Sequence, residues 1–483
     1  MSEQKRRITD VLLATGGNKL RVADVIFSDT IHEINWKSDE FDWNEIASAE
    51  KKRKFFERRG TNGAPSDFNG GFNLLVPGAI DAHVHFNTPG FEAREDFEHG
   101  TTAAAFGGVT TIIDMPCTSL PPVTNAENFR QKLSAVKNRS VVDFAFRGGV
   151  RGNDFPDFEN VRRQITELAD EGVVGFKVYV ISGMETFTDL TYEQIEKVAN
   201  VIKSTGKPMC VHAEDKALVV SRREKLRSEG RNDWRAYCEA RDVKAETTAV
   251  KKIIEIAERT GVKTHVVHLS SAAALAEIIA ARKRGVGITA ETCPHYLFFT
   301  QNDFDNPKIS AFLKTAPPVK FAEDRAALWR GLQNGDLIFV TTDHAGCNPE
   351  TEKTGENFWN VYGGIPGVEH RVPFLFSEGF LKKRLTLEQT VNLLAGNVAE
   401  FYSLPRKGKI AKGYDADFAM VNLWRSETVK AENMHSKGKY TPFEGTTFNA
   451  VVETVFLRGK IIASRKTKAE KTIGYGKLIT PVR

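Results

Sequence analysis

The sequence predicts an α/β protein, a (β/α)8 TIM-like barrel with a small β-sandwich domain formed by both chain ends. The middle of the chain alternates β-branched or aromatic runs with amphipathic Ala/Glu/Lys-rich segments, as repeated βαβ units of a parallel sheet do. Both ends instead carry short strand-like runs separated by glycine turns. The length of 483 residues suits one such barrel with an accessory domain.

Composition excludes several classes of protein. The chain has 67 Lys+Arg against 62 Asp+Glu, a net charge of +5, and 41% hydrophobic residues, which excludes a disordered chain and argues against a polyanionic partner. No apolar run approaches the ~18 residues that cross a bilayer, and the first residues lack the apolar core of a signal peptide, so we expect no membrane partner. Five cysteines without a CxxC pair indicate neither a disulfide framework nor a cysteine zinc site, and favour the cytoplasm.

Residues 1–75 are expected to form the first part of the β domain, through short strands such as DVLLAT and LRVADVIFSDTIHEI. They include a charged, turn-rich insertion over residues 36–72 with a basic run at residues 51–54. A basic run can contact nucleic acid, but a solvated helix face is the commoner reason for one. We therefore expect an exposed insertion and no nucleic-acid partner.

Residues 76–405 are expected to form the barrel. Eight candidate strands follow one another along it, and the first begins just before residue 76. They are residues 73–86, 109–115, 141–148, 173–180, 208–212, 263–269, 286–291 and 337–343. Helical segments such as NVRRQITELADEG separate them. Residues 406–483 return to short strands with glycine turns, so we expect them to complete the β domain.

Polar side chains at the strand ends indicate a metal site. His83 and His85 close the first barrel strand, and two residues of separation place both imidazoles on one face. His212, His268 and Asp343 end the fifth, sixth and eighth strands. In barrels of this type the carboxyl ends of the strands converge on one mouth, where catalytic groups gather. Imidazoles with a carboxylate suit divalent transition metals of the zinc type.

Lys177 lies inside the fourth strand, in the apolar run VVGFKVYV. A cation is costly to bury without a partner. One interpretation is a structural salt bridge. The other is a neutral amine that reacts with carbon dioxide, because the resulting carbamate has two oxygens that can bridge two metals.

Several motifs resemble those of one family, the cyclic amidohydrolases of the amidohydrolase superfamily, which contains allantoinase, dihydroorotase and hydantoinase/dihydropyrimidinase. The motifs that carry the resemblance are PGAIDAHVHF (77–86), GTTAAAFGGVTTIIDMP (100–116), GFKVYV (175–180), VHAED (211–215), VVHLSS (266–271), ETCPHYL (291–297), APPVK (316–320), TTDHAG (341–346), YGGIPGVE (362–369), GKIAKGYDADFAMVN (408–422) and YTPFEG (440–445).

The resemblance implies a binuclear centre with two divalent ions per subunit, zinc first, with cobalt, manganese or iron as alternatives. In this family His83, His85, Asp343 and an N6-carboxylated Lys177 would hold one ion. Lys177, His212 and His268 would hold the other. All six positions are filled, which argues against the non-enzymatic relatives that have lost ligands. The resemblance also implies a homo-oligomer, with a tetramer as the usual state.

Within the family, the segments KTAPPVK (314–320) and DMPCTSLPPVT (114–124) are most like those of allantoinases. Dihydroorotases hold their substrate carboxylate with an arginine and two asparagines, where this chain has Asn87, Cys117 and Ala316. We therefore expect no cation for an anionic ring, and allantoin, a neutral cyclic ureide, as the substrate. Hydantoinase/dihydropyrimidinase activity is the alternative, ahead of dihydroorotase.

The resemblance further implies roles for side chains around the mouth. Asp343 would be catalytic, taking a proton from the attacking water and delivering it to the departing ring nitrogen. Substrate contacts are expected from Thr118, Ser119, Ala316, Gly364 and Gly367. The charged trio Glu369, His370 and Arg371 follows these glycines, and if it reaches the pocket it would favour a different ureide or cyclic amide. His295 and His344 lie near the mouth in sequence and are expected to have no central role.

Overall fold

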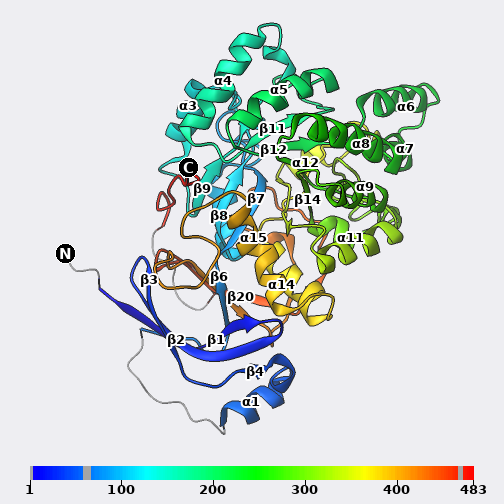
Figure 1. The fold of residues 1–483 in the computed structure, drawn as a ribbon. Coiled ribbons are helices and arrows are strands. Elements are labelled where there is room, and N and C mark those ends of the chain that lie inside the picture. The colour runs from blue at the N-terminus through cyan, green and yellow to red at the C-terminus, as the bar shows by residue number, and fades with distance from the viewer. Residues whose placement is uncertain (1–3, 58–66, 466–471, 483) are drawn as a thin grey trace.

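The computed structural model describes residues 4–57, 67–465 and 472–482, and in it the middle of the chain closes into a barrel (Figure 1). Parallel pairings connect β10 to β15 in one sheet and β16 to β9 in another. Because β9 runs on into β10, and β15 into β16, the two sheets form one closed ring, and the predicted fold class is confirmed. The barrel strands are β7 (Ala79–His85), β8 (Val109–Asp114), β9 (Asp143–Phe146), β10 (Gly148–Gly149), β11 (Phe176–Tyr179), β12 (Met209–His212), β13 (Thr264–Val266), β14 (Ile288–Thr292), β15 (Phe339–Val340) and β16 (His344–Ala345).

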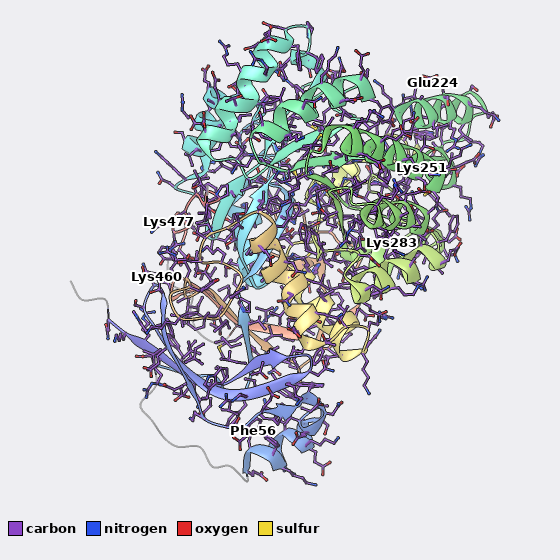
Figure 2. The ribbon with its side chains drawn as sticks, in the orientation of Figure 1. Phe56, Glu224, Lys251, Lys283, Lys460 and Lys477 are labelled. Atoms are coloured by element: carbon purple, nitrogen blue, oxygen red, sulfur yellow. The ribbon has the colours of Figure 1, made fainter. Side chains whose placement is uncertain are left out.

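Helices connect successive strands and cover the outside of the barrel (Figure 1). Helices such as α4, α5 and α8 bury an apolar stripe. Charged side chains point outward on the helices, as Glu224, Lys251 and Lys283 show (Figure 2). The helices of the barrel region are α2 (Phe97–Phe106), α3 (Ala126–Val136), α4 (Phe158–Glu171), α5 (Tyr192–Ser204), α6 (Lys216–Ser228), α7 (Trp234–Ala240), α8 (Val243–Thr260), α9 (Ala272–Lys283), α10 (Pro294–Phe298), α11 (Ala322–Asn334), α12 (Pro349–Glu352), α13 (Arg371–Phe374), α14 (Leu387–Val391) and α15 (Asn397–Phe401). In the described part of the chain, no helix is both long enough and apolar enough to cross a membrane.

The first expected strand, residues 73–86, is two strands that belong to different sheets. β6 (Leu74–Pro77) pairs with the small sheet, and β7 pairs with the barrel. The change occurs at Gly78, whose N–H donates to Asp417 of the small domain (2.9 Å), whereas the next N–H, of Ala79, donates to Gly108 (3.0 Å). The sequence does not reveal this division, because both strands are fully buried and therefore show no change of pattern where one ends and the other begins.

Both chain ends build one nine-stranded sheet below the barrel in Figure 1. β6 lies between β1 and β17, so the N-terminal and C-terminal strands meet there. Alternation along β6 separates two cores: Leu74 and Val76 pack in the large cluster that includes the barrel, and Leu75 packs in the sheet's own cluster. The other strands of the sheet are β1 (Arg6–Gly16), β2 (Lys19–Phe27), β3 (Ile31–Trp36), β4 (Phe41–Asp42), β5 (Phe68–Asn69), β17 (Phe418–Asn422), β20 (Val451–Leu457) and β21 (Lys460–Ser464), and a separate pair is formed by β18 (Glu427–Thr428) and β19 (Thr447–Phe448).

The insertion expected at residues 36–72 carries the basic run on a short helix, α1 (Ala49–Glu57). Its Phe56, labelled in Figure 2, is buried and stacks on Phe72 with ring centroids 3.7 Å apart. Lys52 lies 3.8 Å from the centroid of the Trp424 ring, and Lys54 pairs with Glu50 at 2.6 Å. The insertion is thus anchored by aromatic packing. Its residues 58–66 lie outside the described residues.

A buried cluster of charges joins the barrel to the small sheet. Lys407 Nζ contacts carboxylate oxygens of Asp143, Asp415 and Asp417 at 2.7, 2.9 and 2.6 Å. Asp143 belongs to barrel strand β9 and also pairs with Arg458, which follows β20 of the small sheet. The cluster therefore links three separate parts of the chain.

Candidate functional site

A cavity of about 430 Å³ opens at the carboxyl ends of the barrel strands. The five strand-end residues singled out from the sequence all line it, namely His83, His85, His212, His268 and Asp343. The parallel strands bring them together because each contributes the residue at or just after its carboxyl end.

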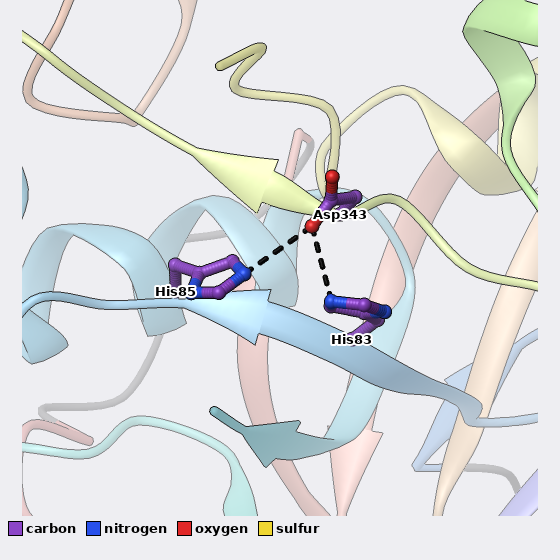
Figure 3. A group of neighbouring side chains, drawn as sticks. All are labelled: His83, His85 and Asp343. Carbon is purple, nitrogen blue, oxygen red and sulfur yellow. Dashed lines mark ion pairs between the residues drawn. The ribbon is translucent and has the colours of Figure 1, made fainter. Parts of the chain in front are cut away.

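His83, His85 and Asp343 converge at one point of this cavity (Figure 3). Asp343 Oδ1 lies 3.1 Å from His83 Nε2 and 3.2 Å from His85 Nε2. Asp343 has a φ of 48°, in the left-handed region that non-glycine residues rarely adopt. Backbone strain of this kind gathers at functional sites, where the surrounding structure maintains it.

The far side of each imidazole is held by a neighbouring group. His83 Nδ1 lies 2.7 Å from Glu291 Oε1, whose second oxygen lies 3.2 Å from His265 Nε2. Because an ionised carboxylate only accepts, Nδ1 of His83 donates to Glu291, and this bond orients the ring. His85 Nδ1 similarly lies 3.2 Å from Thr118 Oγ1.

His212 and His268 form a second pair, with His212 Nδ1 3.1 Å from His268 Nε2. His212 Nε2 contacts Glu214 at 2.9 Å, and Glu214 in turn pairs with Arg241. His268 has a φ of 42°, the same unusual backbone conformation as Asp343. Glu214, Glu291 and Arg241 were not among the residues expected from the sequence.

Lys177 lies beneath the cavity on β11, with a side chain that is 0% exposed. Its Nζ has no hydrogen-bond partner among the described residues and lies 4.7 Å from the centre of the Tyr179 ring. Burial lowers the pKa of this amine to about 8, so a neutral fraction exists near physiological pH. One interpretation of Lys177 is a structural salt bridge, and no carboxylate among the described residues forms one with it.

This donor set fits divalent metal ions. His83 Nε2 is buried without a hydrogen-bond partner in the described chain. The other ring nitrogen of His83 contacts Glu291, and that of His85 contacts Thr118. Metal-binding histidines characteristically have such partners on their second nitrogen. The chemistry of imidazole and carboxylate ligands agrees with zinc-type ions and does not choose among them.

The expected substrate contacts divide into two groups. Thr118, Ala316 and Gly364 line the cavity, whereas Ser119 and Gly367 do not. Ser119 is fully buried, and its hydroxyl donates to the Pro116 carbonyl at 3.3 Å.

The expectation that no cation faces the substrate is wrong, because Arg94 and Arg241 both line the cavity. Each already has a carboxylate partner: Arg94 contacts Glu352 at 2.6 Å, and Arg241 contacts Glu214. Both arginines come from segments outside the barrel strands, so the strand pattern could not place them.

The charged trio after Gly367 does not line this cavity. Glu369 accepts from the backbone N–H of His435 at 2.8 Å, and Arg371 donates to the Val340 carbonyl at 2.6 Å. His344, also near the mouth in sequence, is buried and accepts from the Val368 N–H at 3.2 Å. These residues support the walls of the site from outside.

Comparison with known proteins adds an independent observation. Residues 74–462 match the Amidohydrolase family. The chain is 38% identical over 394 residues to an allantoinase of Rubrobacter xylanophilus and 36% identical over 390 residues to one of Deinococcus radiodurans, in each case covering 80% of this chain and 84% of that protein. Among solved structures, L-hydantoinase (dihydropyrimidinase) from Arthrobacter aurescens superposes with a TM-score of 0.86 at 26% identity, covering 98% of this chain and 99% of that one. Dihydropyrimidinase from Brevibacillus agri gives a TM-score of 0.86 at 27% identity, covering 99% of this chain and 100% of that one.

Proposed function

We infer that this chain, which belongs to the amidohydrolase family, is a hydrolase of cyclic amides that converts allantoin to allantoate. The observation that carries the inference is the convergence of His83, His85 and Asp343 in one cavity, in a chain 38% identical to an allantoinase. The neutral ring and ureido arm of allantoin need hydrogen bonds rather than an unpaired cation, and both arginines of the cavity are already paired.

In this proposal His83, His85, Asp343 and Lys177 hold one divalent ion, and Lys177, His212 and His268 hold the other. Lys177 serves both after its neutral amine adds to carbon dioxide, forming a C–N bond and losing one proton. When bound, such ions lower the pKa of water and polarise a carbonyl group. Zinc is expected first, with cobalt, manganese or iron as alternatives.

Asp343 moves the proton in the proposed reaction. Burial opposes its ionisation, but His83 and His85 hold its pKa well below the ordinary range, so it is a carboxylate at neutral pH. It accepts a proton at Oδ from the attacking water and passes it to the ring nitrogen as the amide bond breaks. Glu291 and Thr118 keep the neighbouring imidazoles in place during this transfer.

Polar groups of the cavity wall orient the ring. The Thr118 hydroxyl and backbone groups of Ala316 are the proposed hydrogen-bond partners of the ring amides and ureido arm. Gly364 is proposed to contact the ring by packing, because its N–H donates to the Lys314 carbonyl and its carbonyl accepts from Tyr440. Ser119 and Gly367, which do not line the cavity, are proposed to support its wall rather than to touch the ring.

A substrate panel tests the proposal. Allantoin, dihydroorotate, hydantoin and dihydrouracil are offered at equal concentration, and kcat/KM is measured for each. Allantoin is expected to be preferred, and dihydroorotate to be worse by about 10⁴-fold, the discrimination that hydrogen-bonding sites reach. Comparable turnover of dihydroorotate would overturn the assignment.

A hydantoinase is the second candidate, favoured by one observation. The L-hydantoinase (dihydropyrimidinase) and the dihydropyrimidinase named above superpose on 98% and 99% of this chain at a TM-score of 0.86. Faster hydrolysis of hydantoin or dihydrouracil than of allantoin in the same panel would establish it.

The proposal extends to the setting of the enzyme. Five free and buried cysteines support a reducing cytoplasm, and family resemblance supports a homo-oligomer, with a tetramer as the state to test by light scattering.

A further inference from the structure

Two buried lysines, Lys314 and Lys353, stand beside the cavity without a carboxylate partner among the described residues. Each is only 4% exposed. Lys314 begins the segment KTAPPVK (314–320), and Lys353 follows helix α12. A buried ammonium is costly unless its donors are satisfied, so the partners of these two groups matter.

Lys314 uses its three donors on one short stretch of backbone. Its Nζ donates to the carbonyl oxygens of Phe358, Trp359 and Val361 at 2.6, 3.1 and 2.5 Å. These carbonyls belong to residues 354–364, a segment without helix or strand that we name the cavity loop. One side chain thus contacts three carbonyls of the loop.

Lys353 makes the reciprocal set of contacts. Its Nζ donates to the carbonyls of Ala311, Lys314 and Tyr362 at 3.1, 3.4 and 2.9 Å. The Gly364 N–H also donates to the Lys314 carbonyl at 2.9 Å. Lys314 thus bonds carbonyls of the cavity loop, and Lys353, which directly precedes that loop, bonds carbonyls of the segment around Lys314. These contacts join the two segments.

The cavity loop supplies a wall of the substrate cavity. The loop residues that line the cavity are Trp359, Tyr362, Gly363 and Gly364. With neither helix nor strand to hold the loop, its shape depends on contacts with its neighbours. These include the two ammonium groups, the Tyr440 hydroxyl, which donates to the Gly364 carbonyl at 3.0 Å, and the Asn232 carbonyl, which accepts from the Phe358 N–H at 2.7 Å. Buried carbonyls that lose their donor are left unsatisfied, which favours another loop conformation.

We propose that Lys314 and Lys353 are positioning residues that hold the cavity loop in the conformation that binds substrate. They set the affinity of the site through backbone geometry and take no part in proton transfer. The inference about substrate affinity rests on the proposed function, whereas the inference about loop conformation does not.

The test uses the variants Lys314→Met and Lys353→Met, which keep length and apolar stem and remove the donors. Hydrogen exchange measured by mass spectrometry is expected to quicken in the cavity loop by about 10-fold in either variant, because its backbone opens more easily. With the cyclic amide that the parent chain hydrolyses best, KM should rise about 10-fold and kcat should change less than ~2-fold, the pattern of lost ground-state binding. The double variant should be little worse than the worse single variant, since both act on one loop.

Two controls separate positioning from general damage. Lys308→Met alters an exposed lysine shortly before Lys314 in the chain. It should leave hydrogen exchange in the cavity loop, KM and kcat unchanged. Lys320→Met removes a buried lysine that donates to the backbone carbonyl of Arg241 and not to the cavity loop. This variant should leave hydrogen exchange in the cavity loop unchanged. Lys314→Arg, which keeps donors, should restore part of the lost affinity.

Unchanged loop exchange in a folded Lys314→Met or Lys353→Met protein would overturn the proposal, as would a fall in kcat without a rise in KM. Should one variant not fold, the other still decides, because each lysine contacts the loop on its own. A parent chain that hydrolyses no cyclic amide would refute the proposed function. Hydrogen exchange in the cavity loop would still test whether the two lysines hold that loop.

Discussion

Lys177 is the side chain whose surroundings demand the most explanation, since it is an amine that is fully buried and has no partner in the described chain. Lys177→Ala removes the proposed bridge between the two ions, so we expect metal content, measured by elemental analysis, to fall to one ion per chain or none. Small carboxylic acids with bicarbonate should restore part of the activity by filling the space. Two bound ions and normal turnover in this variant would show that the lysine is only a structural cation.

Asp343 is the residue at which metal binding and proton transfer can be separated. Asp343→Asn keeps the shape of the side chain and removes its basicity, so kcat should fall by the ~10²–10⁴-fold typical of lost general acid–base catalysis. Metal content should fall less, because His83 and His85 remain in place. Near-normal turnover would contradict the role given to Asp343 and move the base elsewhere.

At this scale the sequence is informative where a residue type conflicts with its local pattern. Lys177 in an apolar strand is such a conflict, and Glu291 in the strand VGITAE is another that the same reasoning could have found. Arg241 carries no such signal, because an arginine between helices α7 and α8 is ordinary until the fold brings it to Glu214. Lys314 likewise shows its role only through contacts with carbonyls more than forty positions away.

Among the elements, the junction of β6 and β7 leaves no room for a larger residue at Gly78. A Cβ built on Gly78 would lie 2.1 Å from Thr110 Oγ1 and 2.3 Å from Thr110 Cγ2. Gly78→Ala should therefore lower the free energy of unfolding by about 1–3 kcal/mol, as overpacking does. Denaturant unfolding measures this, and adding Thr110→Ala should recover part of the loss by removing two of the clashing atoms. Full stability of the single variant would show that β8 can move away.

The same junction marks how far element prediction extends. Each of the eight expected barrel strands contains an observed strand, because β-branched runs between amphipathic helices are a strong local signal. The division at Gly78 depends on two hydrogen bonds, from the Gly78 N–H to Asp417 and from the Ala79 N–H to Gly108. Both acceptors are distant in the sequence, so no local pattern reveals them. The cavity loop is similarly invisible, since nothing periodic defines a segment that lysines hold.

For the whole molecule, the buried charges around Lys407 decide how firmly the barrel and the small sheet are joined. Burial acts to lower the pKa of Lys407, but the three carboxylates around it raise that pKa well above the ordinary value. The stabilisation is therefore complete below the unfolded pKa of about 10.4 and is lost only as pH rises through the higher folded value.

Lys407→Met leaves Asp143, Asp415 and Asp417 buried with less compensation, and should destabilise the protein at pH 8 by about 3–5 kcal/mol. Burial raises the pKa of Asp417 even with Lys407 present, and removing the cation should raise it further. The folded variant then binds a proton more tightly than the unfolded chain does, so the deficit should shrink as pH falls toward 5. Thermal unfolding at both pH values measures this, with Lys409→Met, an exposed neighbour, as control. A deficit that grows on acidification would contradict the assignment.

The place of β6 between β1 and β17 also has a consequence for biosynthesis. Leu74 pairs with Leu12 on one side and with Val421 on the other, and the second partner leaves the ribosome only after the entire barrel has been translated. Until then a nascent chain presents β6 with one open, apolar edge, the kind of surface that recruits other strands. A message truncated before codon 418 would yield a product with this edge permanently open, and such a product is expected to aggregate even though every barrel strand is present.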